Sequence, residues 1–202
     1  MTSNYAKIIR ENLTRTYQNL LENLEKSLPA VKKENFFYFR AFGEDCCLGP
    51  EGVTLSGKPQ EGPKGLLISL YANHSKPDPI QLEPFQSFKD LPGSMPYQGA
   101  FISNSERILV PYVLLIKENQ QIILDAFHGG RGSEGIAGDF SFILYPLPKI
   151  AICYIFYLPD EEFSASATCL LSANALSFMP LDGLADVAEY TSKTILTLLA
   201  DT

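Results

Sequence analysis

The strongest constraint on the fold is a stretch between Gly138 and Phe163, in which two apolar runs stand close together. The runs Phe140–Tyr145 and Ile150–Leu158 are rich in β-branched and aromatic residues, and Pro146-Leu147-Pro148 joins them. Residues of these types favour strands. The stretch therefore predicts an antiparallel hairpin at about residues 139–158, in the middle of a sheet.

Three longer segments have apolar residues at intervals of three and four, which predicts amphipathic helices. One runs from Ser3, a suitable N-cap, to Leu28. A second, Tyr97–Lys117, is expected to bend or restart at Pro111, because proline lacks the backbone N–H of a helix interior. The third, Leu181–Leu199, has Asp182 as its predicted N-cap.

Shorter segments predict further strands. Phe36–Phe42 is aromatic and ends at a glycine, and the residues from Asp45 to Leu55 predict a hairpin. Ser164–Leu171 could return as a third strand beside the central hairpin, whereas Gly65–Ala72 fits either a strand or a short helix. Hairpins outnumber βαβ units, so we expect an α+β fold with a mainly antiparallel sheet, packed by the N-terminal, middle and C-terminal helices.

Both faces of the predicted hairpin are apolar, and the helices at either end of the chain are expected to cover them. The chain has 202 residues, of which 46% are hydrophobic, and one domain over residues 1–202 is the expectation. Its oligomeric state does not follow from the sequence.

The balance of charge argues against nucleic acid as a partner. The chain has 16 basic and 23 acidic residues, for a net charge of −7, and no basic cluster compensates locally. The N-terminus lacks the pattern of a signal peptide, and Lys149 and two prolines interrupt the longest apolar run. We therefore expect a cytoplasmic protein that neither spans nor binds a membrane.

The four cysteines are predicted to be free thiols. Cys46 and Cys47 are adjacent, a spacing that zinc and iron–sulfur sites do not readily use. Cys153 and Cys169 lie inside apolar segments, where reduced cysteine behaves as a small hydrophobic residue. No metal site is predicted, and the sequence does not indicate a cofactor.

Several motifs resemble a known family. They are Gly-Asp-Phe-Ser-Phe at residues 138–142, Tyr-Pro-Leu-Pro at 145–148, and Asp-Glu-Glu-Phe at 160–163. Phe42-Gly43 before a hairpin and the segment Phe88–Gly93 also fit. Over roughly residues 36–199 the chain resembles the family called domain of unknown function 3786.

The resemblance implies an anaerobic bacterial or archaeal context and a link to corrinoid or iron–sulfur metabolism, without an established activity. This chain lacks the cysteine-rich cluster domain that some members carry, so an iron–sulfur cluster does not transfer to it. Where the family tends to have an aspartate after the apolar segment, this sequence has Ser172.

The first candidate site is the acidic corner, formed by Asp160, Glu161 and Glu162. Three carboxylates at a strand exit could bind a hard cation or a cationic group, or supply a general base. The alternative is a solvated turn that keeps a sheet edge soluble. Because Pro159 introduces the turn, we favour this alternative.

The second candidate is the glycine-rich loop His128–Gly138, in which His128 and Arg131 could bind an anion. It lacks the order of a P-loop or a dinucleotide fingerprint. A mobile loop, or a backbone that approaches another segment closely, is the alternative. With two histidines in the chain and no nucleophile elbow, a conventional hydrolase is disfavoured.

Aromatic residues offer a third candidate. An apolar pocket with phenol hydroxyls could be lined by Tyr154, Phe156, Tyr157 and the run Phe36–Phe39, although core packing explains such residues as well. The leading hypothesis is accordingly a protein that binds a small molecule or a protein partner. The alternatives are an enzyme that uses the acidic corner with His128 and Arg131, and an interaction module that docks through the helix Tyr5–Leu28.

Overall fold

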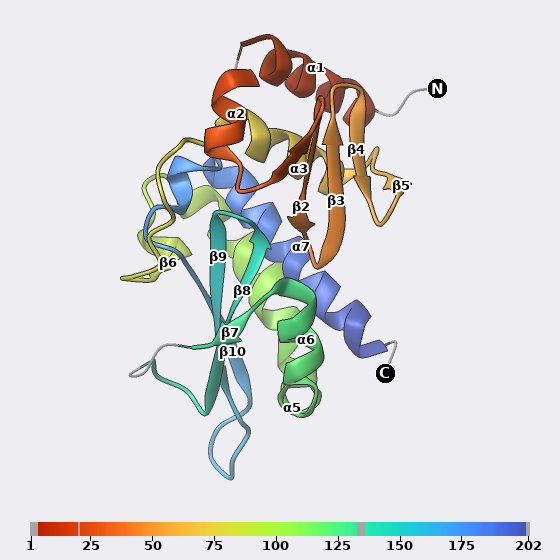
Figure 1. The fold of residues 1–202 in the computed structure, drawn as a ribbon. Coiled ribbons are helices and arrows are strands. Elements are labelled where there is room, and N and C mark those ends of the chain that lie inside the picture. The colour runs from red at the N-terminus through yellow and green to blue at the C-terminus, as the bar shows by residue number, and fades with distance from the viewer. Residues whose placement is uncertain (1–3, 20, 133–135, 201–202) are drawn as a thin grey trace.

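The structure is a computed structural model that describes residues 4–19, 21–132 and 136–200. In this part of the chain, two antiparallel five-stranded sheets organise the fold, with strand orders β1-β2-β3-β4-β5 and β6-β10-β9-β8-β7 (Figure 1). The α+β class and the antiparallel pairing are confirmed. The single predicted sheet is in fact two.

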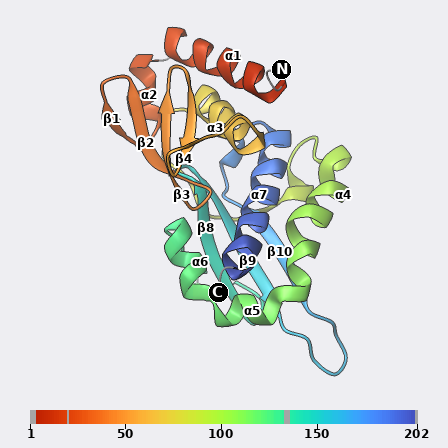
Figure 2. The same cartoon turned by 90° about the vertical axis from the view of Figure 1, so that its right-hand side faces the viewer.

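The first sheet is a meander at the N-terminal end of the molecule. Its strands are β1 (Val31–Lys33), β2 (Phe36–Ala41), β3 (Glu44–Gly49), β4 (Gly52–Leu55) and β5 (Lys58–Pro59). The predicted strand and hairpin are both confirmed. Alternate residues of β2 and β3, such as Phe37 and Leu48, are buried, and helices pack on that face (Figure 2).

The second sheet contains the predicted central hairpin. Its strands are β6 (Gln86–Ser87), β7 (Gly130–Arg131), β8 (Phe140–Leu147), β9 (Ile150–Tyr157) and β10 (Ser166–Leu171). The hairpin β8–β9 and the third strand β10 are confirmed. Pro146 lies inside β8, where the pairing is interrupted between Leu144 and Leu147, so its missing N–H breaks no regular ladder.

Helices surround the sheets. The α-helices are α1 (Asn4–Asn19), α2 (Leu21–Ser27), α3 (Pro63–His74), α4 (Gln98–Phe101), α5 (Val113–Glu118), α6 (Gln120–Phe127) and α7 (Leu181–Ala200). The shorter turns are the 3-10 segments η1 (Phe88–Asp90), η2 (Met95–Tyr97), η4 (Arg107–Tyr112) and η5 (Ala175–Ser177), and the π-helical segment η3 (Ile102–Glu106).

Two predicted helices differ from the observed ones at their N-terminal parts. The helix predicted from Ser3 to Leu28 is two helices, and Ser3 itself lies outside the described residues. A straight helix over that range would be about 39 Å long, and the break lets Leu24 and Leu28 turn back into the core. Asp182 lies in the first turn of α7, which begins at Leu181, so it is not the N-cap.

The ambiguous segment Gly65–Ala72 is helical. Helix α3 begins at Pro63, whose fixed φ suits a first turn, and it packs against α1, α7 and β4. Its apolar residues are spread around the helix axis, and half of its residues are buried. Such a helix has no clear polar stripe, and periodicity therefore could not identify it.

The predicted helix Tyr97–Lys117 is broken into five pieces, η2 (in its last residue), α4, η3, η4 and α5. Pro111 lies in the 3-10 segment η4, close to where a bend was expected. The π-helical turn of η3, however, was not anticipated. Residues after this helix continue as α6, which ends at Phe127.

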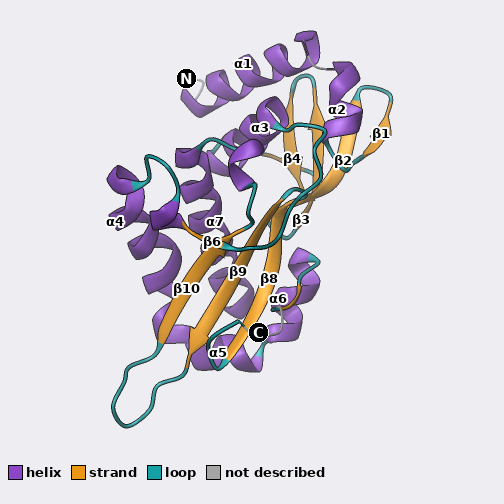
Figure 3. Ribbon diagram, turned by 90° about the vertical axis from the view of Figure 1, so that its left-hand side faces the viewer, coloured by secondary structure: helices purple, strands orange, loops and turns teal. Residues whose placement is uncertain are grey.

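The two faces of the β8–β9 hairpin are covered differently from the prediction. Helices, including α7, lie over one face, whereas loops cross the other (Figure 3). On the loop side, Ile80, Leu82 and Phe85 pack against a small cluster that contains Cys153 and Ile155. The N-terminal helix α1 packs instead on α3 and β4. Terminal helices on both faces were therefore the wrong expectation.

The described part of the glycine-rich loop lies against β8. Gly130 and Arg131 pair with β8 as β7, and the amide of Gly132 donates to the carbonyl of Ser141. A Cβ on Gly129 would come within 2.6 Å of the carbonyl oxygen of Ile143. Close backbone approach therefore explains Gly129, whereas a Cβ on Gly130 would meet nothing within 4 Å. Residues 133–135 lie outside the described residues.

Candidate functional site

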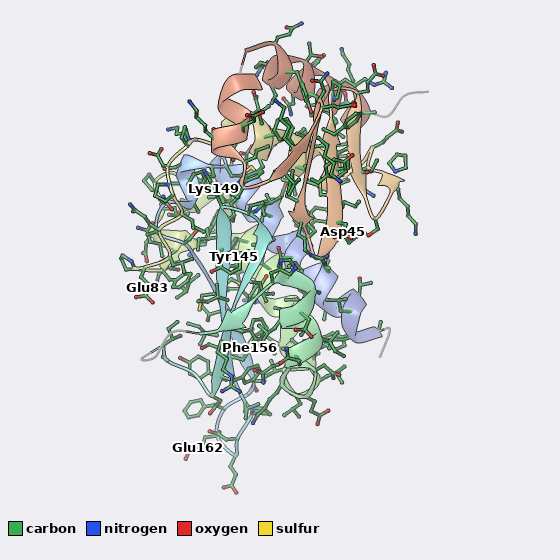
Figure 4. All side chains as sticks on the ribbon, viewed as in Figure 1. Asp45, Glu83, Tyr145, Lys149, Phe156 and Glu162 are labelled. Atoms are coloured by element: carbon green, nitrogen blue, oxygen red, sulfur yellow. The ribbon has the colours of Figure 1, made fainter. Side chains whose placement is uncertain are left out.

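The acidic corner is a solvent-exposed turn that is closed on itself. Asp160, Glu161 and Glu162 lie in the loop between β9 and β10, and all three are exposed. The carboxylate of Asp160 accepts hydrogen bonds from the amides of Glu162 and Phe163, at 2.8 and 2.7 Å. These two amides lower the pKa of Asp160. Glu162 lies at the tip of a projecting loop, away from Asp45 and Tyr145 (Figure 4).

The candidate tyrosines have opposite environments. Tyr154 is fully buried, with its hydroxyl 3.1 Å from Oγ of Ser192, and burial raises its pKa well above 10.0. Tyr157, at the end of β9, is exposed. They do not form a shared pocket wall.

His128 lies in a cleft between the two sheets, whereas Arg131 is exposed on edge strand β7 and does not line it. The junction cleft, as we call it, has a volume of about 650 Å³. It is lined by Pro29, Tyr38, Phe39, Arg40, Asp45, Cys46, Phe127, His128, Tyr145 and Pro148. Tyr145 and Asp45 both line it, although they come from different sheets.

The contact between the two sheets depends on the turn between β2 and β3. Phe42 and Gly43 both have positive φ, 50° and 78°, as a two-residue hairpin turn of the type I′ kind requires. The amide of Phe42 donates to the carbonyl of Pro146 at 2.7 Å, which joins the first sheet to β8. The Phe42 ring is fully buried, so this strained conformation is held in place.

Arg40 lines the cleft and joins β2 to the turn after it and to helix α6. Its Nη1 donates to Asp45 at 2.9 Å, and its Nη2 donates to the carbonyls of Gly43 and, at 3.0 Å, Ala126. Ala126 is in the last turn of α6, where carbonyls lack helical partners, so the guanidinium caps that helix. His128 follows directly, with φ of 49° in the left-handed region.

The electrostatic character of the cleft is balanced. The positive charge of Arg40 is paired with Asp45, so a ligand meets little net charge there. Cys46 contributes no thiolate, because burial raises its pKa. Apart from the imidazole of His128, the remaining lining is apolar or phenolic. Chemically, the cleft offers ring faces and neutral hydrogen-bonding groups.

Two features are absent from the described residues. Among them, no group of three or more His, Cys, Asp or Glu side chains lies close enough together to hold a metal ion. Within the same residues, no helix is both long and apolar enough to cross a membrane. Ser172, at the position where an aspartate was expected, is buried, and its Oγ accepts from the amide of Ala151 at 3.4 Å.

Sequence reasoning named His128 and, within the run Phe36–Phe39, Tyr38 and Phe39 as candidates, and it missed Arg40, Asp45 and Tyr145. A signal was present. Arg40 and Asp45 flank the Phe42-Gly43 turn and are register partners across β2 and β3, so the hairpin places opposite charges side by side. Nothing in the local sequence indicated that Tyr145 would lie beside them.

Comparison with known proteins gives a family and no individual relative. No curated protein and no solved structure matches the chain. The family model described as "Domain of unknown function (DUF3786)" matches residues 17–194, which include the hairpin, the junction cleft and the acidic corner. The match starts earlier than the resemblance did, within α1. The chain therefore belongs to the DUF3786 family.

Proposed function

We propose that this protein binds a small organic molecule in the junction cleft, one with a planar apolar body and hydrogen-bonding groups at its edge. The observation that carries the proposal is the lining of that cleft. Its volume of about 650 Å³ is that of a small-molecule site. Tyr38 and Tyr145 supply phenol groups, and Phe39 and Phe127 supply apolar surface.

The paired charges favour a neutral ligand over a strongly charged one. Nη1 and Nη2 of Arg40 are engaged with Asp45 and with two backbone carbonyls, and of its nitrogens only the buried Nε has no partner among the described residues. Its charge is therefore already paired, and the Nε left without a partner could serve a neutral acceptor. His128 stands at the cleft with both ring nitrogens able to donate or accept according to tautomer. A ligand edge that carries amide or hydroxyl groups would suit this set.

The alternatives are less well supported. An enzyme that combines the acidic corner with His128 would need those groups to converge, and the acidic corner is an exposed loop that does not line the cleft. An interaction module would need the apolar stripe of the N-terminal helix to be free. Ile9 and Leu13 on that stripe are buried in the core of this chain.

Native mass spectrometry of protein purified under anaerobic conditions tests the proposal directly. We expect a non-covalent adduct with the mass of one small molecule, present in wild type and lost in Tyr145→Ala. The identity of that adduct would also test the expected link to corrinoid or iron–sulfur metabolism. An unmodified mass would count against the proposal.

A fluorescent probe gives a second measurement that does not require the natural ligand. We expect the neutral probe N-phenyl-1-naphthylamine to bind at one saturable site, with affinity reduced at least about fivefold by Tyr145→Ala. Tyr157→Ala is the matched control, because Tyr157 is exposed outside the cleft. His128→Gly removes the imidazole at a backbone position that glycine tolerates, so it tests that ring without straining the chain. Equal affinity in all variants would refute the site.

A further inference from the structure

A second cleft lies between strand β10 and the broken middle helix, apart from the junction cleft. We call it the β10 cleft; its volume is about 530 Å³. Its apolar lining comes from Ile102, Val110, Pro111 and Ala167. Its polar lining comes from Glu106, Arg107 and Ser166. The two clefts have no residue in common.

The π-helical segment η3 explains why Glu106 points towards β10. A π-turn widens the helix and leaves carbonyls without regular helical partners, and such turns are frequent at functional sites. The carbonyl of Ser105 accepts instead from Oγ of Ser192 at 2.7 Å and from the thiol of Cys169 at 3.7 Å. Glu106, the last residue of η3, is thereby held against the strand.

The two oxygens of the Glu106 carboxylate differ in their partners. Oε1 accepts from the backbone amide of Cys169 at 2.9 Å. That amide is available because β6 pairs with β10 at Leu170 and Leu171, beyond Cys169. Within the described residues, Oε2 accepts no hydrogen bond. Burial raises the pKa of Glu106, and the amide of Cys169 opposes that shift.

Glu106 and Arg107 both face the β10 cleft, yet in the described part of the chain they form no ion pair with each other. Each charge is therefore available to a ligand. A partly buried carboxylate gains most from a cation that brings its own N–H donors. The guanidinium of Arg107 can bind a carboxylate of the ligand through two parallel hydrogen bonds.

We propose that the β10 cleft binds a zwitterionic small molecule, an α-amino acid with an apolar side chain, with its ammonium group on Glu106 and its carboxylate on Arg107. The apolar side chain would lie on Ile102, Val110 and Pro111. The hydroxyl of Ser166 supplies one further hydrogen-bonding group. This site is independent of the ligand proposed for the junction cleft.

Three matched probes test the charges one at a time. L-leucine carries both charges, 3-methylbutan-1-amine lacks the carboxylate, and 4-methylpentanoate lacks the ammonium. In titrations followed by amide NMR, we expect leucine to bind at least about tenfold more tightly than either analogue, since each loses a charged hydrogen-bonding contact. The shifted amides should belong to η3, η4 and the start of β10.

Variants then assign the two groups. Glu106→Gln keeps an oxygen that can accept from the Cys169 amide, so the fold should persist while leucine affinity falls at least about tenfold. Glu118→Gln, an exposed carboxylate on α5, is the control and should change nothing. Arg107→Gln, at an exposed position, should reduce leucine affinity to that of the amine analogue. This second variant keeps the test decisive if Glu106→Gln fails to fold.

Two outcomes would overturn the proposal. One is the absence of any change in amide chemical shifts with leucine at about 50 mM. That concentration is far above the dissociation constant of a specific small-molecule site. The other is equal binding of all three probes, which would indicate an apolar surface without recognition of charge. Tyr145→Ala should leave leucine binding unchanged, and this separates failure here from failure of the junction-cleft proposal.

Discussion

The hydroxyl of Tyr154 on β9 lies 3.1 Å from Oγ of Ser192 on α7, in a fully buried position. Oγ of Ser192 donates its one proton to the carbonyl of Ser105, at 2.7 Å, so it accepts from Tyr154. A single serine thus connects the central hairpin, the C-terminal helix and the π-helical segment. Tyr154, a candidate ligand-binding residue by sequence, is part of the core.

Removing Ser192 should therefore destabilise the protein more than removing the phenol hydroxyl. Ser192→Ala removes the acceptor of the Tyr154 hydroxyl and leaves the Ser105 carbonyl only the weak thiol donor of Cys169. We therefore expect a loss of about 2–3 kcal/mol in the free energy of unfolding. Tyr154→Phe should lose about 1 kcal/mol. Urea unfolding measures both, with exposed Ser103→Ala as the control. The double variant should cost less than the sum, because its hydroxyl partners leave together. Strict additivity would argue against the shared bond.

Arg40 should matter more to stability than its ion-pair partner Asp45. Arg40→Met removes donors from the Ala126 and Gly43 carbonyls, and we expect a loss of about 1.5–3 kcal/mol in unfolding free energy. Asp45→Asn should cost less than about 1 kcal/mol, because the Asp45 side chain is 86% exposed. Chemical denaturation compares these with Arg15→Met, at an exposed position on α1. Equal losses of unfolding free energy in Arg40→Met and Asp45→Asn would mean that the ion pair, and not the helix cap, stabilises the fold.

Only one of the four thiols should react rapidly in the native protein. Cys46, Cys153 and Cys169 are buried, and Cys47 is half-buried. Burial also raises the pKa of Cys153 to about 11, which further suppresses its thiolate at neutral pH. Titration with a disulfide reagent should find one fast thiol, abolished in Cys47→Ser, and four after denaturation. Rapid labelling of Cys153 or Cys169 would contradict their placement in the core.

The carboxyls of Asp160 and Glu106 should titrate on opposite sides of their usual values. Amide donors hold the pKa of Asp160 below 3.8, whereas burial raises that of Glu106 above 4.5. Asp160 binds its proton less readily when folded, so its stabilising contribution is lost as pH falls through its folded pKa. Glu106 binds its proton more readily in the folded state than in the unfolded state. It therefore lowers the free energy of unfolding as pH rises from 4.5 to its folded pKa.

Carboxyl carbon NMR titration of the folded protein measures both pKa values. Glu106→Gln provides the control on stability: relative to wild type, it should gain unfolding free energy as the pH rises through that window. The acidic corner itself should tolerate Asp160→Asn with Glu162→Gln, since both side chains are exposed. A wild-type Asp160 that titrates above 3.8 would remove the evidence for the closed turn.

Local sequence patterns predicted the long apolar strands and the helices that have one buried and one solvated face. The runs Phe140–Tyr145 and Ile150–Leu158 predicted β8 and β9, and the stripe Leu181–Leu199 predicted α7. Patterns failed where an element lacks a clear polar face or where neighbours replace its hydrogen bonds. Helix α3 has no clear polar face to mark it, and η3 depends on donors from distant Ser192 and Cys169.

The candidate sites divide in the same way. The sequence identified His128 and the acidic corner because unusual residue types stand close together in the chain. The tertiary structure alone placed Arg40 and Tyr145 beside His128, and Glu106 against β10. Clefts form where segments distant in sequence meet, and that meeting is set by how buried faces pack, which no local period encodes. The chain by itself determined its longer strands, its family and its charge. Packing decided the short edge strands and which side chains share a site.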